Sequence, residues 1–223
     1  MTEELQNKYQ DVIDAFKSRR FDPVIFVSSA AEAKKAVMDM IPEGAKVVTG
    51  GSTTLRQVGL FDELKSKQML TISGADVFLS SSNVITEDGK LLNTDMTGNR
   101  VSGMIYGHKQ VIIVVGVNKL VKDREAGLDR LRNLINPYLS KSAGLKNPCV
   151  VDGKCHDCKS PTRVCSVTTI LEAKPRVTDI AIVLVGEDLG LGWNPDWEEA
   201  RKKKIANVFK EKWAEMFAAR TAK

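Results

Sequence analysis

The sequence predicts an α/β fold in which a mostly parallel sheet is flanked by helices and a cysteine-bearing loop is inserted late in the chain. Segments typical of strands alternate with segments typical of helices, an order that favours a parallel sheet covered by helices. The run Val111–Val117 contains no polar side chain, whereas a strand with one solvated face would alternate. We therefore expect this run to be buried on both faces.

Composition limits the chain to the ordinary globular class. Of its 223 residues, 43% are hydrophobic and 27% charged, and the net charge is +5, so we expect one domain over residues 1–223. No apolar run is long enough to span a bilayer and the N-terminal residues do not form a signal peptide, which predicts a cytoplasmic protein. Basic residues are scattered and aromatics make up 6%, so we expect no nucleic-acid binding.

The first fifty residues show helix and strand signals in turn. An amphipathic pattern comes first, and an apolar run follows Pro23. Ser28 or Ser29 is placed to cap the next helix, with Glu32 in the position of a capping box. The expected elements are a helix over 3–19, a strand Val24–Val27, a helix through about Met40 and a strand Ala45–Thr49.

A glycine-rich turn, Gly50–Thr54, follows the last of these strands directly, and a helical pattern broken near Gly59 follows the turn. Glycines and hydroxyl caps at the start of a helix leave backbone N–H groups free for an anion. The spacing matches neither a Walker A loop nor a dinucleotide fingerprint, so a plain capped turn is the alternative. The candidate binding residues here are Gly51, Ser52, Thr53 and Thr54.

Residues 77–119 gather amide, carboxylate and guanidinium groups between two apolar runs. Strand signals at 70–73 and 76–79 lead into this stretch, and a turn at Glu87-Asp88-Gly89 divides it. Loops that follow the strands of an α/β sheet are where such proteins bind ligands. We therefore expect a small-molecule pocket here.

A carboxylate-bearing substrate needs a cation to pair with and an acid or base to move a proton. The stretch supplies both kinds of group, together with amides suited to orienting the substrate. Turns and caps that only satisfy their own backbones are the alternative. We assign Arg100 and Lys119 to the substrate carboxylate, Asp95 and Glu87 to proton transfer, and Asn83 and Asn99 to binding.

The second half of the chain continues the alternation. A helical pattern covers Asp123–Leu139, and strand signals cover Val167–Leu171 and Ile180–Val185. A C-terminal helix is expected over about 196–220. Amphipathic helices at both ends of the chain make a homodimer a reasonable expectation. The predicted buried face of the last helix consists of Trp197, Ile205, Val208, Phe209, Trp213 and Phe217.

The four cysteines fall in one predicted loop, at about 145–166. They are Cys149, Cys155, Cys158 and Cys165, and a reducing compartment favours a metal or redox site over disulfides. Structural zinc usually takes two close pairs, whereas one close pair within a single loop is closer to the wrapping of a cuboidal iron–sulfur cluster. We expect an iron–sulfur cluster of the 4Fe-4S type, with zinc or free redox-switching thiols as alternatives.

Five short motifs occur in order along the chain: Gly51–Leu55 with Gly59-Leu60, Asn83–Gly89, Asp95–Val101, Val114–Lys119 and Val185–Gly190. Together they resemble the LUD-domain family, named for lactate utilisation proteins. The resemblance runs from about residue 5 to 195 and implies a fold like those of ribose-5-phosphate isomerase, glucosamine-6-phosphate deaminase and CoA transferases. It also implies a link to a multi-protein system that oxidises L-lactate to pyruvate through iron–sulfur centres.

The resulting expectation is an iron–sulfur oxidoreductase component that acts on a small hydroxy- or oxo-acid such as lactate and exchanges electrons with redox partner proteins. One alternative is a non-redox isomerase, lyase or transferase that uses the cluster as a Lewis acid. A zinc-stabilised binding subunit is the other. Fold likeness alone does not separate these.

Overall fold

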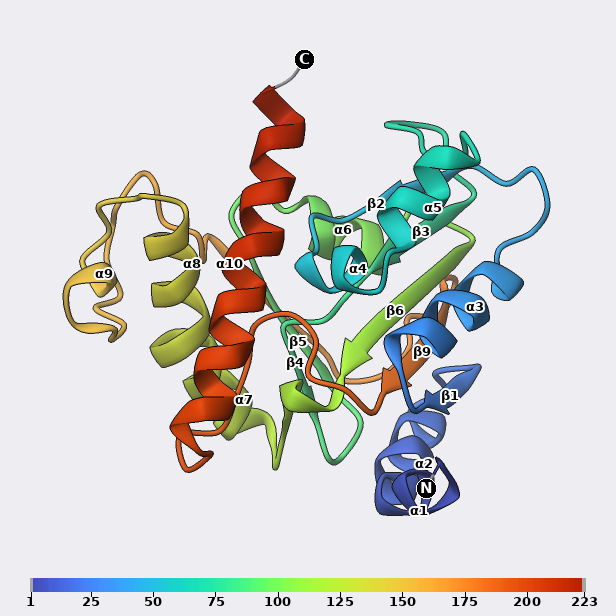
Figure 1. Ribbon diagram of the computed structural model, residues 1–223, viewed down its shortest axis with the longest axis horizontal. Helices are drawn as coiled ribbons and strands as arrows, with labels where there is room; N and C mark the ends of the chain where they lie inside the picture. Colours follow the sequence, from blue (N-terminus) through green and yellow to red (C-terminus); the bar gives the residue numbers. More distant parts are fainter. Residues whose placement is uncertain (1, 222–223) are drawn as a thin grey trace.

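A parallel five-stranded sheet forms the centre of the protein (Figure 1). The computed structural model describes the backbone of residues 2–221 and the side chains of residues 4–216. The prediction of a mostly parallel sheet flanked by helices is confirmed. In spatial order the strands are β1 (Val24–Val27), β9 (Asp179–Val185), β6 (Gln110–Gly116), β3 (Val77–Ser80) and β2 (Val47–Thr49).

Strand β6 is the middle of this sheet, and its residues from Val111 onward are buried, as predicted from their apolar run. Val111 and Ile113 share a hydrophobic cluster with α2 (Gln10–Ser18), which follows α1 (Thr2–Lys8), whereas Ile112 and Val114 face the opposite layer. That opposite layer consists of α3 (Ala30–Met40), α4 (Thr53–Gln57) and α5 (Leu60–Ser66).

The predicted N-terminal elements are largely confirmed. The helix expected over 3–19 is present but is divided at Tyr9 into α1 and α2. Ser29 caps α3 and accepts a hydrogen bond from the Glu32 backbone N–H at 3.3 Å, while the Glu32 side chain accepts from the Ser28 backbone N–H at 2.8 Å. Gly59 adopts φ +75° between α4 and α5, which explains the break in the helical pattern.

The strand expected over 70–73 is absent. Leu70 makes an isolated bridge to Val47, and the chain then turns, with the Thr71 hydroxyl donating to the Ser73 carbonyl at 2.8 Å. A local side-chain hydrogen bond of this kind competes with strand pairing. The prediction of a strand at this position was therefore wrong.

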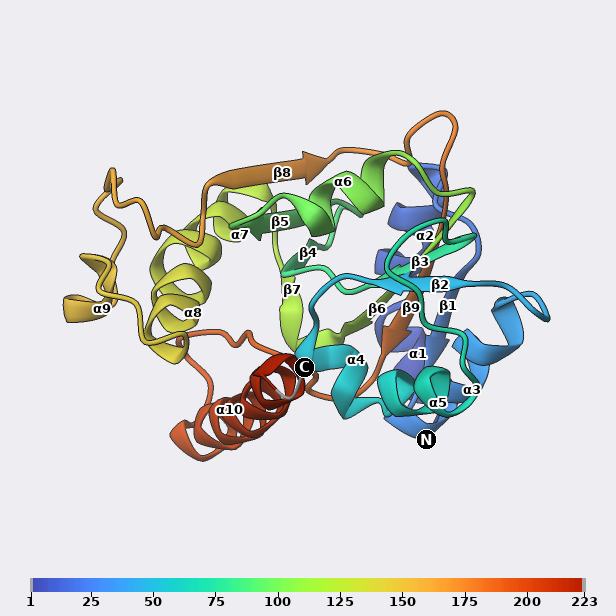
Figure 2. The ribbon, with the colours of Figure 1, turned by 90° about the horizontal axis from the view of Figure 1, so that it is seen from above.

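A second sheet of four strands lies beside the first (Figure 2). A hairpin through Gly89 joins two antiparallel strands, and the strand predicted at 167–171 pairs with this hairpin rather than with the main sheet. This second sheet was not predicted from the sequence. Its order is β7 (Leu120–Val121), β4 (Val84–Thr86), β5 (Leu91–Asp95) and β8 (Val167–Leu171).

A helical layer covers one side of the second sheet. The helix predicted over 123–139 runs from Arg124 to Ser142 as α7 (Arg124–Arg130), a π turn and α8 (Asn136–Ser142). The short helix α6 (Asn99–Ile105), which the sequence analysis did not predict, packs near β3 and β5. The hydrophobic cluster of this layer unites Val84 and Leu92 of the sheet with Leu131 and Ile135.

The C-terminal helix α10 (Glu199–Thr221) confirms the helix expected over about 196–220, with a later start. Trp197 precedes the helix and is half-buried, whereas Ile205 and Phe209 are buried as predicted. Trp213 donates its indole N–H to the Ser142 carbonyl at 3.1 Å and so joins α10 to α8. The predicted burial of Phe217 lies outside the described side chains.

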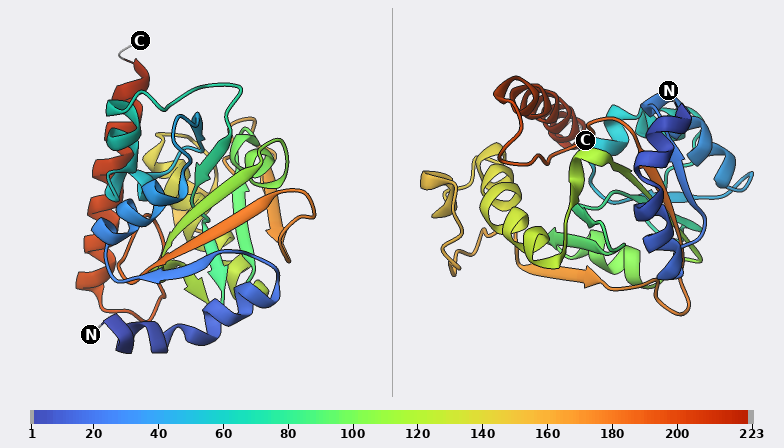
Figure 3. Two further views of the ribbon diagram at one scale, coloured as in Figure 1. Left: turned by 90° about the vertical axis from the view of Figure 1, so that its right-hand side faces the viewer. Right: turned by 90° about the horizontal axis from the view of Figure 1, so that it is seen from below.

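The loop that carries the cysteines includes the short helix α9 (Cys149–Asp152) and projects at the end of the molecule opposite the N-terminal helices (Figure 3). It leaves α8 and returns through β8. None of the helices in residues 2–221 combines the length and the hydropathy that a membrane crossing would require.

Candidate functional site

A cavity of about 220 Å³ lies between the two sheets and the helices α4, α6, α8 and α10, whose arrangement can be followed in Figure 2. Its polar side comes from residues at or after the carboxyl ends of β2, β3, β5 and β6, the usual ligand-binding edge of a parallel sheet. All predicted substrate-site residues except Glu87 line this cavity. Those residues are Gly51, Ser52, Thr53, Thr54, Asn83, Asp95, Asn99, Arg100 and Lys119.

Lys119 is the most deeply enclosed charged residue in this cavity wall, with 4% of its surface exposed. It ends the turn that follows β6, and its Nζ lies 2.8 Å from Thr54 Oγ1, 2.8 Å from Ser81 Oγ and 3.0 Å from the Ser82 carbonyl. Burial and, to a smaller extent, the nearby charge of Arg100 together lower the pKa of Lys119 from 10.5 to about 7. Lys119 can therefore exchange a proton near neutral pH.

Arg100 is the second cation of the cavity, at the start of α6. Its Nη2 donates to the Gly51 carbonyl at 2.6 Å, and its buried Nε has no hydrogen-bond partner among the described residues. Burial lowers the pKa of Arg100, while the charge of Asp95 acts in the opposite direction. A buried donor without a partner costs about 1–3 kcal/mol, so this guanidinium has capacity for a further acceptor.

Asp95 lines the cavity but is engaged as a helix cap. Its Oδ2 accepts from the Arg100 backbone N–H at 2.8 Å and from that of Val101 at 3.4 Å, and its Oδ1 accepts from the Thr97 backbone N–H at 3.0 Å. The N–H groups of Arg100 and Val101 are among the first backbone donors of α6, which otherwise lack partners, whereas Thr97 precedes the helix. The carboxylate therefore fixes α6, and with it Arg100, at the rim of the cavity.

The side chains of Asn83 and Asn93 accept backbone hydrogen bonds across the hairpin formed by β4 and β5. Asn93 Oδ1 accepts from the Asn83 backbone N–H, and Asn83 Oδ1 accepts from the Thr94 backbone N–H, both at 3.0 Å. The Asn93 amide nitrogen and the Thr94 hydroxyl are buried without partners among the described residues. Thr94 lines the cavity beside Asn83, which adds an unpaired hydroxyl to the site.

Glu87 lies apart from the other predicted residues. It is exposed and lines a different cavity together with Arg130. The hairpin that it enters packs against α2, because a Cβ on Gly89 would lie 2.6 Å from the Ala15 carbonyl carbon. Pairing between strands thus directs Glu87 away from Lys119, although both belong to the same polar stretch.

Ser81, Thr94 and Asn118 are site residues that the sequence analysis missed. The run Ser80-Ser81-Ser82 directly after β3 was the available signal for Ser81. Asn118 accepts from the Leu189 backbone N–H and donates to the Gly192 carbonyl, both at 2.9 Å, which holds the loop after β9 against Lys119.

The opposite wall of the cavity is apolar. Its side chains come from α8, from the segment around the cysteine loop and from α10. They are Ile135, Leu139, Ala143, Leu145, Val164, Leu191, Phe209, Trp213 and Met216. The cavity thus has a charged polar end and an apolar end.

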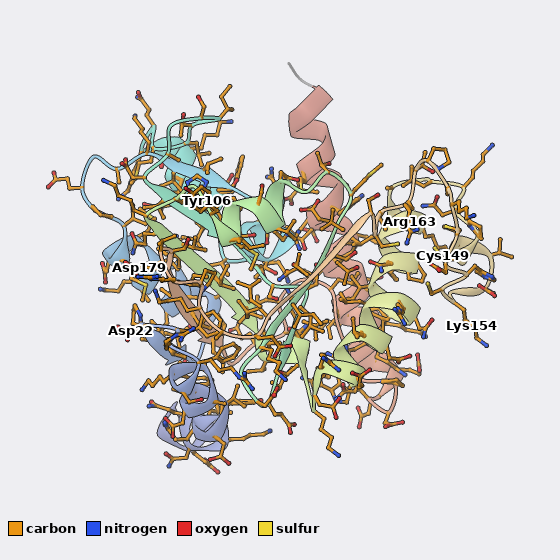
Figure 4. The ribbon with its side chains drawn as sticks, turned by 180° about the vertical axis from the view of Figure 1, so that it is seen from behind. Asp22, Tyr106, Cys149, Lys154, Arg163 and Asp179 are labelled. Carbon is orange, nitrogen blue, oxygen red and sulfur yellow. The ribbon has the colours of Figure 1, made fainter. Side chains whose placement is uncertain are left out.

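Three of the four cysteines interact electrostatically. Burial raises the pKa of Cys149, and the neighbouring Cys158 and Cys165 thiols raise it further. Arg163 donates to Cys165 Sγ at 3.6 Å and to the Cys158 carbonyl at 2.8 Å. Figure 4 shows Arg163 and Cys149 within the same peripheral loop. Cys155 is exposed.

The cysteine thiols do not converge on one point within the described residues. Within residues 2–221, no three His, Cys, Asp or Glu side chains come close enough to hold one metal ion. Tetrahedral zinc needs four ligands at about 2.0–2.3 Å from one point. A cuboidal cluster takes its thiolates on separate irons, so its ligand sulfurs lie farther apart.

The cysteine loop adjoins the cavity. The β5–β8 pairing places Val167 opposite Asp95, and Cys165 precedes Val167 by two residues. Val164 and Leu145, which belong to the same loop as the thiols, line the apolar wall of the cavity. The loop and the polar residues are therefore parts of one region.

The fold and the site define an α/β protein with a small cationic pocket at the edge of its sheets. The sequence matches the LUD domain family over residues 9–72 and 67–185, and the chain belongs to this family. A search of curated proteins found no match. The crystal structure of a DUF162 family protein from Deinococcus radiodurans is similar, with 15% identity over 83% of this chain and 99% of that one, and a TM-score of 0.48.

Proposed function

We propose that the chain is an iron–sulfur component of an oxidoreductase that acts on a small hydroxy- or oxo-acid such as lactate. The observation that carries this proposal is the pair of enclosed cations, Lys119 and Arg100, on one cavity. No ion pair links Lys119 to an acid in the described part of the chain, and the carboxylate of Asp95 is occupied by backbone donors. A bound carboxylate would supply the missing negative charge.

The size of the cavity supports a small acid. Its volume of about 220 Å³ falls below the roughly 300–1,000 Å³ of pockets for drug-sized ligands. Lys119 and Arg100 would bind the carboxylate, and the hydroxyls of Thr54 and Ser81 would meet the substrate oxygen. The apolar wall favours a substrate with a short hydrocarbon side chain and excludes water from the bound acid.

The cysteine loop supports the redox part of the proposal. Cys149, Cys158 and Cys165 would hold the cluster, with Cys155 as a fourth candidate, and the cluster would supply one-electron transfer when bound. Arg163 donates a hydrogen bond to Cys165 and would stabilise the negative charge of the thiolates. Redox partner proteins and a homodimer belong to the same proposal.

A non-redox isomerase or lyase is the second candidate, and Lys119 is the observation that favours it. An amine whose pKa is about 7 is suited to acid–base chemistry at neutral pH without any electron transfer. In that case a cluster with one iron free of cysteine would act as a Lewis acid on the substrate hydroxyl.

Anaerobic purification followed by an iron count tests the proposal. We expect a brown protein with about four iron atoms per chain. Replacement of Cys149, Cys158 or Cys165 by serine should remove the iron. Zinc without iron, or a colourless metal-free protein, would overturn the redox proposal.

The exposed Cys155 provides the matched comparison. If Cys155→Ser keeps its iron while Cys149→Ser loses it, three cysteines hold the cluster and one iron is open, which favours the non-redox candidate. If both variants lose iron, all four cysteines are needed, which favours electron transfer. Far-ultraviolet circular dichroism of each variant checks that iron loss is not a consequence of unfolding.

A further inference from the structure

We propose that Lys119 forms a covalent imine with an oxo-acid that binds in the cavity. This inference rests on the proposed acid-binding function of the same site. It goes further because it assigns to Lys119 a bond to the substrate carbon rather than an ion pair with the substrate carboxylate. The two roles require different protonation states of the same nitrogen.

The position of Lys119 suits a nucleophile. Lys119 lines the cavity, and the three hydrogen-bond partners of its Nζ, which are Thr54 Oγ1, Ser81 Oγ and the Ser82 carbonyl, are all uncharged. A carboxylate at this position would hold the amine in its charged form, but in residues 2–221 no acid is paired with it. A lysine in a water-poor pocket beside another cation is the usual arrangement for imine chemistry.

The hydrogen bonds of Lys119 are compatible with a neutral amine. A neutral amine has two hydrogens and one lone pair, so it can donate to the Ser82 carbonyl and to one hydroxyl while the other hydroxyl donates to it. Ser81 Oγ also lies 3.3 Å from the Ser82 carbonyl and can donate to that acceptor. Thr54 Oγ1 is therefore the hydroxyl that is free to donate to the amine, and its proton is in place to assist loss of the substrate oxygen.

Arg100 completes the arrangement. Its unpaired Nε can take the carboxylate of the oxo-acid, which leaves Lys119 to meet the adjacent carbonyl carbon. The charge of Arg100 also favours the neutral form of the Lys119 amine. The two cations thus take separate parts of one substrate.

The chemical step balances without an oxidant or reductant. The lone pair of neutral Nζ attacks the carbonyl carbon, one proton passes from the new ammonium nitrogen to the former carbonyl oxygen, and a neutral carbinolamine forms. Loss of that hydroxyl as water, with one proton from the medium, leaves a protonated imine between Nζ and the former carbonyl carbon. The adduct activates the neighbouring carbon for proton removal.

Reductive trapping tests the imine. The full-length protein is incubated at neutral pH with pyruvate as the probe and sodium cyanoborohydride, which donates hydride to an imine. Intact mass spectrometry should show one added unit equal to pyruvic acid minus one oxygen atom. Peptide mapping should place it on Lys119, at a rate at least about tenfold above that of any other lysine, because more of its amine is neutral.

Two variants and a binding measurement make the outcome decisive. Lys119→Met should abolish the selective adduct, whereas Lys90→Met should keep it, because Lys90 lies outside the cavity and pairs with Asp88 and Glu172. Peptide mapping of the trapped wild-type protein does not depend on whether either variant folds. If Lys119 carries no adduct but pyruvate still protects the protein against thermal unfolding, the imine proposal is overturned and the proposed acid-binding site stands. If Lys119 carries no adduct and pyruvate gives no thermal protection, both the imine proposal and the proposed acid-binding site are overturned.

Discussion

Lys119 Nζ lies 2.8 Å from the hydroxyl of Thr54, so the end of the central strand β6 is tied to the first turn of α4 through a buried ammonium group. No acid shares this contact in the described part of the chain. The charge of Lys119 is therefore balanced by dipoles alone, and its protonation should respond to any anion that enters the cavity.

Binding of L-lactate, which cannot form an imine, should weaken as the pH rises above about 7. A bound anion favours the protonated form of Lys119. At a pH where the amine of the free protein is neutral, lactate binding is therefore coupled to uptake of one proton. The dissociation constant should rise by up to about tenfold per pH unit in that range. Arg100 stays charged there, so it adds no second step.

Isothermal titration calorimetry across this pH range measures the effect. Lys119→Met should bind lactate more weakly and with no pH dependence above pH 7. A wild-type affinity that does not change with pH would show that Lys119 does not contact the anion.

Lys119→Met should also change how stability depends on pH. The folded-state pKa of about 7 lies below the unfolded value of 10.5, so between these values the unfolded chain holds more protons. The free energy of unfolding of the wild type therefore rises with pH across this window, and below about pH 7 the full penalty of the buried charge is present. Lys119→Met has no ionisable group at this position, so its free energy of unfolding lacks this pH dependence.

Urea denaturation at several pH values checks this expectation. The stability advantage of Lys119→Met should be greatest below about pH 7 and should shrink toward pH 10.5, by an amount on the order of a few kcal/mol. A difference between the two proteins that stays constant with pH would contradict the depressed pKa.

Asp95→Asn should keep lactate binding, because Asp95 acts as a cap rather than as a free acid. The amide oxygen of asparagine can still accept from the Arg100 backbone N–H, and only the acceptor for Thr97 is lost, at a cost of about 1 kcal/mol. Loss of a negative charge beside Arg100 should leave the affinity for an anion unchanged or higher.

The rate of pyruvate trapping in Asp95→Asn separates capping from proton transfer. A cap predicts less than about tenfold loss, whereas removal of a general acid or base typically costs about 10²–10⁴-fold. A loss of about 10²–10⁴-fold in a folded variant would instead support the proton-transfer role that the sequence predicted for Asp95.

Local patterns were enough to predict the main sheet and most of the polar side of the cavity. The apolar run of β6 and the cap at Ser29 follow from neighbouring residues, and the polar residues follow strands whose ends meet at one edge. The second sheet could not be predicted in this way, because the pairing of β5 with β8 joins residues about eighty positions apart. That pairing also holds the hairpin whose turn directs Glu87 away from the cavity.

The apolar wall was equally hidden in the sequence. Phe209 and Trp213 were predicted as the buried face of a helix, and nothing in their spacing distinguishes a core contact from a cavity lining. Only the packing of α10 beside α4 and α8 places them opposite Lys119. The chemistry of a site can thus be read from residue types, whereas its walls depend on long-range packing.

Gly190→Ala should damage the site more than the fold. Gly190 has φ +71°, and a Cβ there would lie 2.5 Å from Thr54 Oγ1 and 2.9 Å from Lys119 Nζ, so a methyl group would separate the two. Gly74 is the matched control, because its φ of +64° imposes a similar backbone strain of about 1–2 kcal/mol while a Cβ there meets nothing within 4 Å. Both variants should lose stability in thermal unfolding from backbone strain, and Gly190→Ala should lose more because Thr54 and Lys119 must shift. Only Gly190→Ala should lose lactate binding and selective trapping at Lys119, by about tenfold or more, since a misplacement near 1 Å is costly to a reacting group. Equal losses in both variants would mean that the Lys119–Thr54 contact does not govern the chemistry of the cavity.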